Sequence, residues 1–209
     1  MQTASARQLA DRPDRLSLRV KLGFGVGDLG GNLFFTVVGF YLLNYLTDSF
    51  GLAAAAAGTA ALLGTVWDAI TDPAVGYISD RTHTRWGRRR PYMAVGAVFL
   101  FVLLILMFTN PGITSDAGKF TYALVIYCLL NTAYTLVNIP YGSLTPELTS
   151  DFDERTTLNG YRMSFAVVGT LIGAGTVLPL VSLFGGDPTG WTVTAAIMDG
   201  PIASRRSVW

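Results

Sequence analysis

The fold of this chain is decided by the stretch Trp67-Asp-Ala-Ile-Thr-Asp-Pro-Ala-Val-Gly-Tyr-Ile-Ser-Asp-Arg-Thr-His-Thr-Arg-Trp-Gly-Arg-Arg-Arg-Pro91. Its first half places two carboxylates, Asp68 and Asp72, one helical turn apart inside an apolar run. Its second half is a short turn with five arginines. Ionisable groups at bilayer depth are costly and mark a substrate or ion path, and a dense basic turn after a span marks the cytoplasmic side. The stretch therefore predicts a polytopic, all-α membrane transporter.

The composition agrees with a membrane protein and argues against several other classes. Hydrophobic residues make up 51% of the 209 residues and charged residues only 14%, whereas soluble domains contain about 25% charged residues. The single cysteine, Cys128, excludes an intramolecular disulfide and is interpreted as a small packing residue. No nucleotide-binding loop, nucleophile–base pair or metal-ligand spacing is evident, so we expect no enzymatic activity and no cofactor. The basic turn is too narrow for nucleic-acid binding.

Five segments are long and apolar enough to span a bilayer, which takes roughly 20 residues per helix. They are residues 22–47, 53–79, 92–109, 120–144 and 163–184. A sixth apolar run begins at Trp191 and breaks after Met198 into Asp199-Gly200-Pro201. Such a run is too short to cross, because each helical residue rises only about 1.5 Å.

The predicted organisation is therefore a cytoplasmic tail (1–21), a truncated amino-terminal transporter bundle (22–198) of five spans plus an aborted sixth, and an aberrant tail (199–209). An interfacial tail is the alternative for the last segment. No cleavable signal peptide is evident in the arginine-rich residues 1–21, so the first span is expected to direct insertion.

Basic residues predict the orientation in the membrane. The links after spans one and three hold only Lys119. The other side holds Arg7, Arg12, Arg15, Arg19, Lys21, Arg81, Arg85, Arg88, Arg89, Arg90, Arg155 and Arg162. Because basic residues stay on the cytoplasmic face, we expect a multi-pass protein of the plasma (inner) membrane with a cytoplasmic amino terminus.

The carboxylates of span two predict a cation site. Asp68 and Asp72 are four residues apart and project from one helix face. Two carboxylates this close disfavour joint ionisation unless a cation binds between them. Pro73 cannot donate to the carbonyl of Ala69, which leaves a further oxygen free, and hard cations favour oxygen ligands. The coupling ion is therefore Na⁺ or H⁺, with both carboxylates as candidate Na⁺ ligands. The alternative is a structural pair neutralised by an arginine from another helix.

Two polar stripes predict a site for a polyhydroxylated ligand. Span one carries Asp28, Asn32 and Thr36 at a spacing of four residues, among many glycines. Span four carries Asn131, Tyr134, Thr135 and Asn138. Amides and hydroxyls beside an aromatic ring offer both donors and acceptors to a sugar. The same residues also serve as hydrogen-bonding contacts between membrane helices, and the pattern leaves both readings open.

Arg162 stands where the fifth predicted span begins. It is close enough to the membrane surface for its side chain to reach water. The alternative is a cavity-facing role, either pairing with Asp68 or Asp72 or holding a substrate hydroxyl. The residues alone favour neither.

Five motifs resemble the glycoside–pentoside–hexuronide:cation symporters of the major facilitator superfamily, whose best-known member is melibiose permease. They are Lys21-Leu-Gly-Phe-Gly-Val-Gly-Asp28, Tyr45-Leu-Thr-Asp48, Trp67-Asp-Ala-Ile-Thr-Asp-Pro73, Asp80-Arg-Thr-His-Thr-Arg-Trp-Gly-Arg88 and Ile139-Pro-Tyr-Gly-Ser-Leu-Thr-Pro146. The resemblance runs from about Lys21 to Met198. It implies the amino-terminal six-helix half of a twelve-helix fold that works by alternating access.

The resemblance also implies roles for individual residues. The family's cation site falls on Asp68, Asp72 and Thr135, with Thr71 in place of an asparagine, and its helix-five arginine falls on Arg162. Asn32, Asp28, Tyr134 and Asn138 complete the expected substrate side. This chain departs from melibiose permease, because the carboxylates that bind sugar there align with Asn32 and Asn138. The arginine often found before the Trp-Asp pair is Thr65, and an aromatic residue of the sugar site is Gly142. Cation coupling is thus implied, whereas the substrate is left open between a galactoside, another glycoside and a uronide.

The expected function is cation-coupled symport of a sugar or glycoside, with the sugar and the lipid bilayer as partners and no nucleic acid. The alternative is a non-transporting remnant, or a half-transporter that needs a separately encoded carboxy-terminal half. Because five unpaired spans expose polar stripes, we expect the chain on its own to be unstable and open to proteolysis.

Overall fold

A computed structural model describes residues 16–82, 90–186 and 188–203. The predictions for the amino-terminal segment 1–15, for the basic turn with His83, Arg85, Arg88 and Arg89, and for residues 204–209 lie outside the described residues. They stay predictions.

Every regular element in the described ranges is helical, which confirms the all-α class. The elements are α2 (Leu18–Thr36), η1 (Val37–Tyr41), α3 (Leu42–Asn44), η2 (Tyr45–Ser49), α4 (Ala54–Arg81), α5 (Arg90–Met107), α6 (Asp116–Gly142), α7 (Thr145–Leu148), α8 (Phe152–Leu183) and α9 (Pro188–Ala203). The first four form one rod, in which η1 and η2 are π-helical turns.

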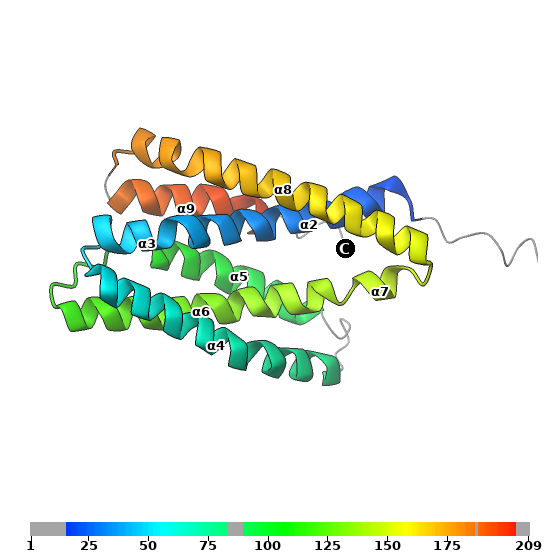
Figure 1. The fold of residues 1–209 in the computed structure, drawn as a ribbon, viewed down its shortest axis with the longest axis horizontal. Helices are drawn as coiled ribbons and strands as arrows, with labels where there is room; N and C mark the ends of the chain where they lie inside the picture. Colours follow the sequence, from blue (N-terminus) through cyan, green and yellow to red (C-terminus); the bar gives the residue numbers. More distant parts are fainter. Residues whose placement is uncertain (1–15, 83–89, 187, 204–209) are drawn as a thin grey trace, which may run out of the picture.

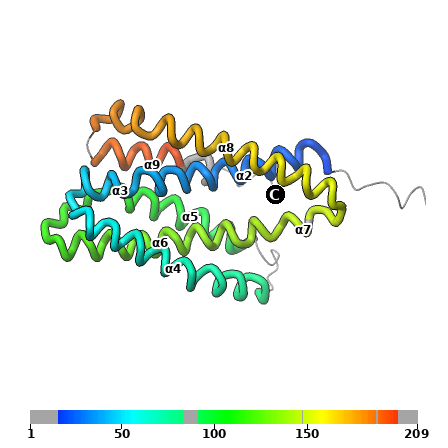
Figure 2. Tube along the Cα trace, in the orientation of Figure 1, coloured from blue at the N-terminus to red at the C-terminus, as the bar shows by residue number. Residues whose placement is uncertain are grey.

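The long helices lie along one common axis (Figure 1). They form two groups, α2 with α8 and α9, and α5 with α6 and α4, which meet where α5 packs against α9. Along the chain the long helices alternate in direction, so that α2 and α8 run parallel to each other, as the tube in Figure 2 also shows. At one end the chain reverses through glycines with positive φ, Gly51, Gly112, Gly185 and Gly186, a backbone conformation that glycine adopts without steric cost.

By length and composition, four helices among the described residues are suited to cross a membrane: Leu18–Ser49, α4, α6 and α8. The third predicted span is apolar but shorter, Pro91–Met107. The five predicted spans therefore all correspond to helices. Many large apolar side chains on these helices are exposed, among them Phe35, Val98 and Leu171, as expected of surfaces that face lipid.

Two helices extend beyond the apolar runs from which they were predicted. α8 begins at Phe152 rather than at residue 163, because Asp151 caps it by accepting a hydrogen bond from the Glu154 N–H, 2.9 Å away. Hydropathy locates where a helix enters the membrane, whereas a cap locates where the helix starts. α9 continues to Ala203, across the predicted break after Met198. Proline near a helix end removes one hydrogen bond and need not end the helix at once.

The largest core cluster lies at the end where the glycines reverse the chain. Tyr45 and Phe108 are fully buried and pack with Trp191 of α9. The Phe108 and Trp191 rings stack with centroids 5.7 Å apart. This packing holds α9 against the rod and against α5.

Candidate functional site

The contact between α4 and α6 positions the two carboxylates. A side chain at Gly64 would overlap the Tyr127 ring, with a Cβ only 2.2 Å from Cδ1, so glycine lets the helices approach closely here. Asn131 is buried and its Nδ2 donates to the Gly64 carbonyl at 3.3 Å. The Trp67 indole N–H donates to Thr132 Oγ1 at 2.9 Å. These links set the register of α4 against α6.

One turn further along this interface, α6 contacts the second carboxylate of α4. Thr135 is buried, and its hydroxyl donates to Asp72 Oδ1 at 2.7 Å or to the Asn131 carbonyl at 3.0 Å. Asp68 Oδ1 is buried and has no hydrogen-bond partner among the described residues. The Thr71 hydroxyl donates within its own helix, to the Trp67 carbonyl at 3.2 Å. The structure thus brings Asp68, Asp72 and Thr135 to one interface.

This carboxylate cluster consists of oxygen groups, with no basic side chain of the described residues paired to them. Within the described ranges, no lysine or arginine forms an ion pair with Asp68 or Asp72, so the alternative of a structural pair neutralised by an arginine is not found. No group of three or more His, Cys, Asp or Glu suited to a metal occurs in this part of the chain either. Two carboxylates and a hydroxyl suit a small hard cation that takes its other ligands from carbonyls and water.

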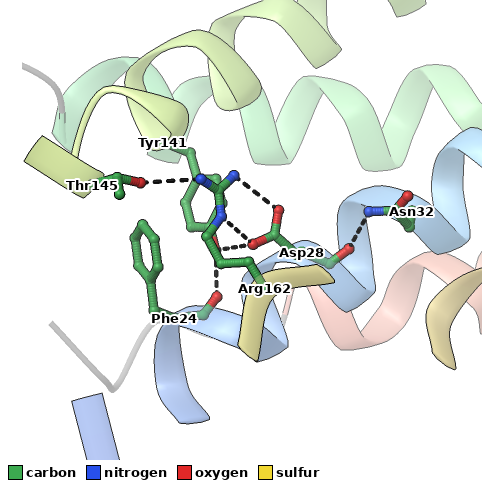
Figure 3. A network of polar contacts seen from close by, with 6 residues as sticks. All are labelled: Phe24, Asp28, Asn32, Tyr141, Thr145 and Arg162. Atoms are coloured by element: carbon green, nitrogen blue, oxygen red, sulfur yellow. Dashed lines mark hydrogen bonds and ion pairs between the residues drawn. The ribbon is translucent and has the colours of Figure 1, made fainter. Parts of the chain in front are cut away.

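A second polar cluster lies between α2 and α8 (Figure 3). Arg162 Nε donates to Asp28 Oδ2 at 2.6 Å, and its Nη2 donates to Asp28 Oδ1 at 3.1 Å. Arg162 Nη1 donates to Thr145 Oγ1 at 3.0 Å. The Tyr141 hydroxyl donates to the Phe24 carbonyl and lies 3.1 Å from Asp28 Oδ2. We call these five residues the Asp28–Arg162 cluster.

The Asp28–Arg162 cluster shows which acid Arg162 meets, a point that the sequence left open. Arg162 pairs neither with Asp68 nor with Asp72, and its partner is Asp28. The reason is the longer α8, which places Arg162 inside the helix and opposite α2, whereas the carboxylates of α4 lie in the other group of helices. Both side chains of the ion pair are mostly shielded, with exposures of 20% for Arg162 and 15% for Asp28.

Tyr141 and Thr145 are members of this cluster that the sequence reasoning missed. Both lie in the motif Ile139–Pro146, which carries part of the family resemblance. The motif was recognised in the sequence, but no function was predicted for these two residues. The Phe24 and Tyr141 rings stack with centroids 4.7 Å apart. The Arg162 guanidinium lies 5.3 Å and 5.4 Å from their centroids, within the range of cation–π attraction.

The structure places the other predicted substrate residues on α2 and α6. Asn32 Nδ2 donates to the Asp28 carbonyl at 2.9 Å, within α2. Tyr134 stacks on Phe34 with ring centroids 4.9 Å apart, and Asn138 is exposed. Asn32 is thus linked to the Asp28–Arg162 cluster through the Asp28 backbone. Tyr134 belongs to α6, the helix that also carries Thr135 of the carboxylate cluster.

Comparison with known proteins identifies the family of this chain. The family described as MFS/sugar transport protein matches residues 23–200. The chain belongs to this family. Membership in this MFS sugar-transport family confirms the resemblance predicted from the motifs, and it makes the chain part of a multi-pass membrane transporter family rather than an enzyme family.

Three relatives illustrate the match. The uncharacterized symporter YnaJ of Bacillus subtilis is 41% identical over 195 residues, which cover 91% of this chain and 42% of YnaJ. The putative glycoside/cation symporter YagG of Escherichia coli is 39% identical, with 82% of this chain and 37% of YagG covered. The isoprimeverose transporter of Lactiplantibacillus pentosus is 39% identical, with 85% and 38% covered. This MFS sugar-transport chain thus spans about two fifths of the length of these relatives.

Proposed function

We propose that this chain forms the amino-terminal half of a symporter that couples a cation, Na⁺ or H⁺, to the uptake of a sugar or glycoside by alternating access. The observation that carries this proposal is the carboxylate cluster of α4 and α6. Asp68 Oδ1 is buried without a partner, and the Thr135 hydroxyl lies on the neighbouring Asp72. Partly buried carboxylates without a basic partner, such as Asp68 and Asp72, are stabilised by a bound cation or a bound proton.

In this proposal Asp68, Asp72 and Thr135 bind the cation, with Thr71 beside them. A cation bound beside Asp72 would be coordinated by a lone pair of the Thr135 hydroxyl oxygen. The hydroxyl proton would then be donated to the Asn131 carbonyl, which lies 3.0 Å away. The hydroxyl would thus change its acceptor from Asp72 to Asn131 on binding. Such a change needs only rotation about one bond, which supports the proposed role of Thr135 as a cation ligand.

The sugar is proposed to lie near Asn32, Tyr134, Asn138 and Arg162. Donors and acceptors from α2, α6 and α8 would recognise hydroxyl groups. The name of YagG, a putative glycoside/cation symporter, supports both the substrate class and the coupling. The relatives are longer than this chain, which supports a second helical half in the working transporter. The inner membrane and a cytoplasmic amino terminus are part of the proposal.

The experiment measures cation binding by the chain itself, in lipid nanodiscs. NaCl is titrated by isothermal calorimetry at constant ionic strength, with choline chloride as the reference salt. We expect saturable Na⁺ binding that Asp72→Asn abolishes. If H⁺ is the coupling ion, we expect no heat from Na⁺ binding but a proton uptake that the same variant removes.

Asp48→Asn is the matched control, because Asp48 is an exposed acid on η2. Among the described residues, its side chain accepts hydrogen bonds from Asn44 and Thr47 of the same rod. This variant should bind like the unaltered chain. Binding of Na⁺ or H⁺ that persists unchanged in a chain carrying both Asp68→Asn and Asp72→Asn would refute the assignment.

A further inference from the structure

A groove lies between the end of α4 and the beginning of α5. Its volume is about 330 Å³. The residues that line it are Thr82, Pro91, Tyr92, Val95 and Leu136. Leu136 belongs to α6, against which both α4 and α5 pack. Glycine brings α5 close to α6 at this level, because a Cβ at Gly96 would lie 2.9 Å from the Leu136 Cβ. The groove is thus a cleft between two helices, with a third helix as its floor.

The surroundings of the groove place it just inside the surface of the membrane. Val95 and its neighbour Val98 on α5 are exposed and apolar. On α4, Tyr77 and Arg81 are exposed, and the Arg81 guanidinium lies 4.0 Å from the centre of the Tyr77 ring. Tyrosine and arginine side chains gather at the level of the lipid headgroups. The apolar part of the groove therefore faces the hydrocarbon next to that level, so a lipid acyl chain is the group that covers it.

Two hydroxyl groups form the polar end of the groove. Thr82 Oγ1 lies 2.6 Å from the Tyr92 hydroxyl oxygen and donates to the Ile78 carbonyl at 2.8 Å. With the Thr82 proton on Ile78, Tyr92 is the donor between the two hydroxyls. Tyr92 could turn its proton to a phosphate oxygen while Thr82 keeps its own acceptor. The exchange favours the phosphate, because a hydrogen bond to an ionised acceptor is about twice as strong as one between neutral groups.

The segment that joins the two sides of the groove is strongly basic. Residues 80–90 contain one acid, Asp80, and five arginines, namely Arg81, Arg85, Arg88, Arg89 and Arg90. Three of these arginines, at positions 85, 88 and 89, lie outside the described residues. Clusters of roughly four to eight basic residues at the end of a membrane helix attract anionic lipids. The excess of positive charge therefore favours an anionic headgroup over a zwitterionic one.

We propose that this groove binds an anionic glycerophospholipid, with an acyl chain against Val95 and Leu136 and the phosphate near the Tyr92 hydroxyl and Arg81. Such a lipid bridges the end of α4 and the beginning of α5. Because α4 also carries the two acids of the carboxylate cluster, the lipid stabilises the helix that holds them. The lipid site does not depend on which substrate is transported.

Native mass spectrometry of the full chain, released from detergent micelles, counts the lipids that stay bound. The probes are phosphatidylglycerol and phosphatidylcholine with identical acyl chains, which differ in headgroup charge. We expect one phosphatidylglycerol to bind about fivefold more tightly than phosphatidylcholine, because a single basic residue near an anionic lipid contributes about this factor. Arg81→Gln and Tyr92→Phe should each reduce that preference, since they remove a charge and a donor from the headgroup end.

Val95→Trp fills the groove, and Val98→Trp is its matched control. The two valines are 51% and 50% exposed on the same helix, and Val98 is not among the described residues that line the groove. Val95→Trp should abolish the tightly bound phosphatidylglycerol, whereas Val98→Trp should retain it. Arg19→Gln is the control for general attraction of anionic lipid. Arg19 is an exposed residue in the first turn of α2, at the same end of the bundle as the end of α4 (Figure 1), and its loss should leave the preference unchanged.

Equal affinities for the two lipids would overturn the proposal. So would a loss of preference in Arg19→Gln as large as in Arg81→Gln, or release of the lipid by Val98→Trp, because either result describes lipid spread over the helix surface. A dimer that Val95→Trp dissociates, with lipid binding unchanged, would make a second copy of the chain the occupant and would also overturn it. Helical circular dichroism shows whether each variant is folded. Where Val95→Trp does not fold, an unchanged preference in both Arg81→Gln and Tyr92→Phe overturns the proposal.

Discussion

The close approach of Gly169 on α8 to the backbone of α2 makes Gly169→Ala a sharp test of the packing. A Cβ at Gly169 would lie 2.5 Å from the Leu29 carbonyl oxygen and 3.1 Å from Leu29 Cα. Both are backbone atoms, so no side chain can rotate away and the helices themselves must separate. Gly175, on the same helix, has nothing within 4 Å of its Cβ position and provides the matched control.

The magnitude follows from these distances. Carbon and oxygen make close contact at about 3.3 Å, so the helices must separate by about 0.8 Å from the 2.5 Å contact. Overpacking of this kind destabilises by roughly 1–3 kcal/mol, whereas alanine gains about 1 kcal/mol over glycine in a helix. We therefore expect Gly169→Ala to lose about 1 kcal/mol of unfolding free energy on balance and Gly175→Ala to gain about 1 kcal/mol.

The separation should also weaken the neighbouring ion pair. Leu29 follows Asp28 directly, so moving α2 by about 0.8 Å would also lengthen the contacts between Asp28 and Arg162. The 2.6 Å contact would reach the limit of a hydrogen bond, and the 3.1 Å contact would exceed it. The assay is reversible unfolding by sodium dodecyl sulfate in mixed micelles, followed by helical circular dichroism. The reasoning fails if Gly169→Ala is as stable as Gly175→Ala.

Two further predictions concern the same helix interface. Lys21→Glu and Glu154→Lys should each lower stability by about 3 kcal/mol, because each places like charges where a 2.8 Å ion pair lies, and the double exchange should recover most of the loss in the same unfolding assay; no recovery would contradict the pairing. Tyr141→Phe removes the hydroxyl that contacts the Phe24 carbonyl and Asp28 and should cost about 1–2 kcal/mol in thermal unfolding, while Tyr77→Phe, on an exposed ring of α4, should change little.

Local properties of the chain predicted most of the secondary structure. A span is an uninterrupted apolar run, and nothing beyond neighbouring residues is needed to recognise it, so all five predicted spans correspond to helices. The boundaries were less accurate because hydropathy does not register caps, as the start of α8 at Phe152 shows. The spacing of Asp68 and Asp72 likewise followed from helix geometry alone.

Partners on other helices could not be derived in this way. Arg162 and Asp28 are 134 positions apart along the chain, and the residues near Arg162 contain no information about which acid it meets. That choice depends on the parallel packing of α2 against α8, which glycines such as Gly169 permit by their lack of a side chain. Thr135 meets Asp72 for the same kind of reason, through the α4–α6 contact. Helices form from local periodicity, whereas the pairing of their polar groups is settled by how closely and in which register the helices pack.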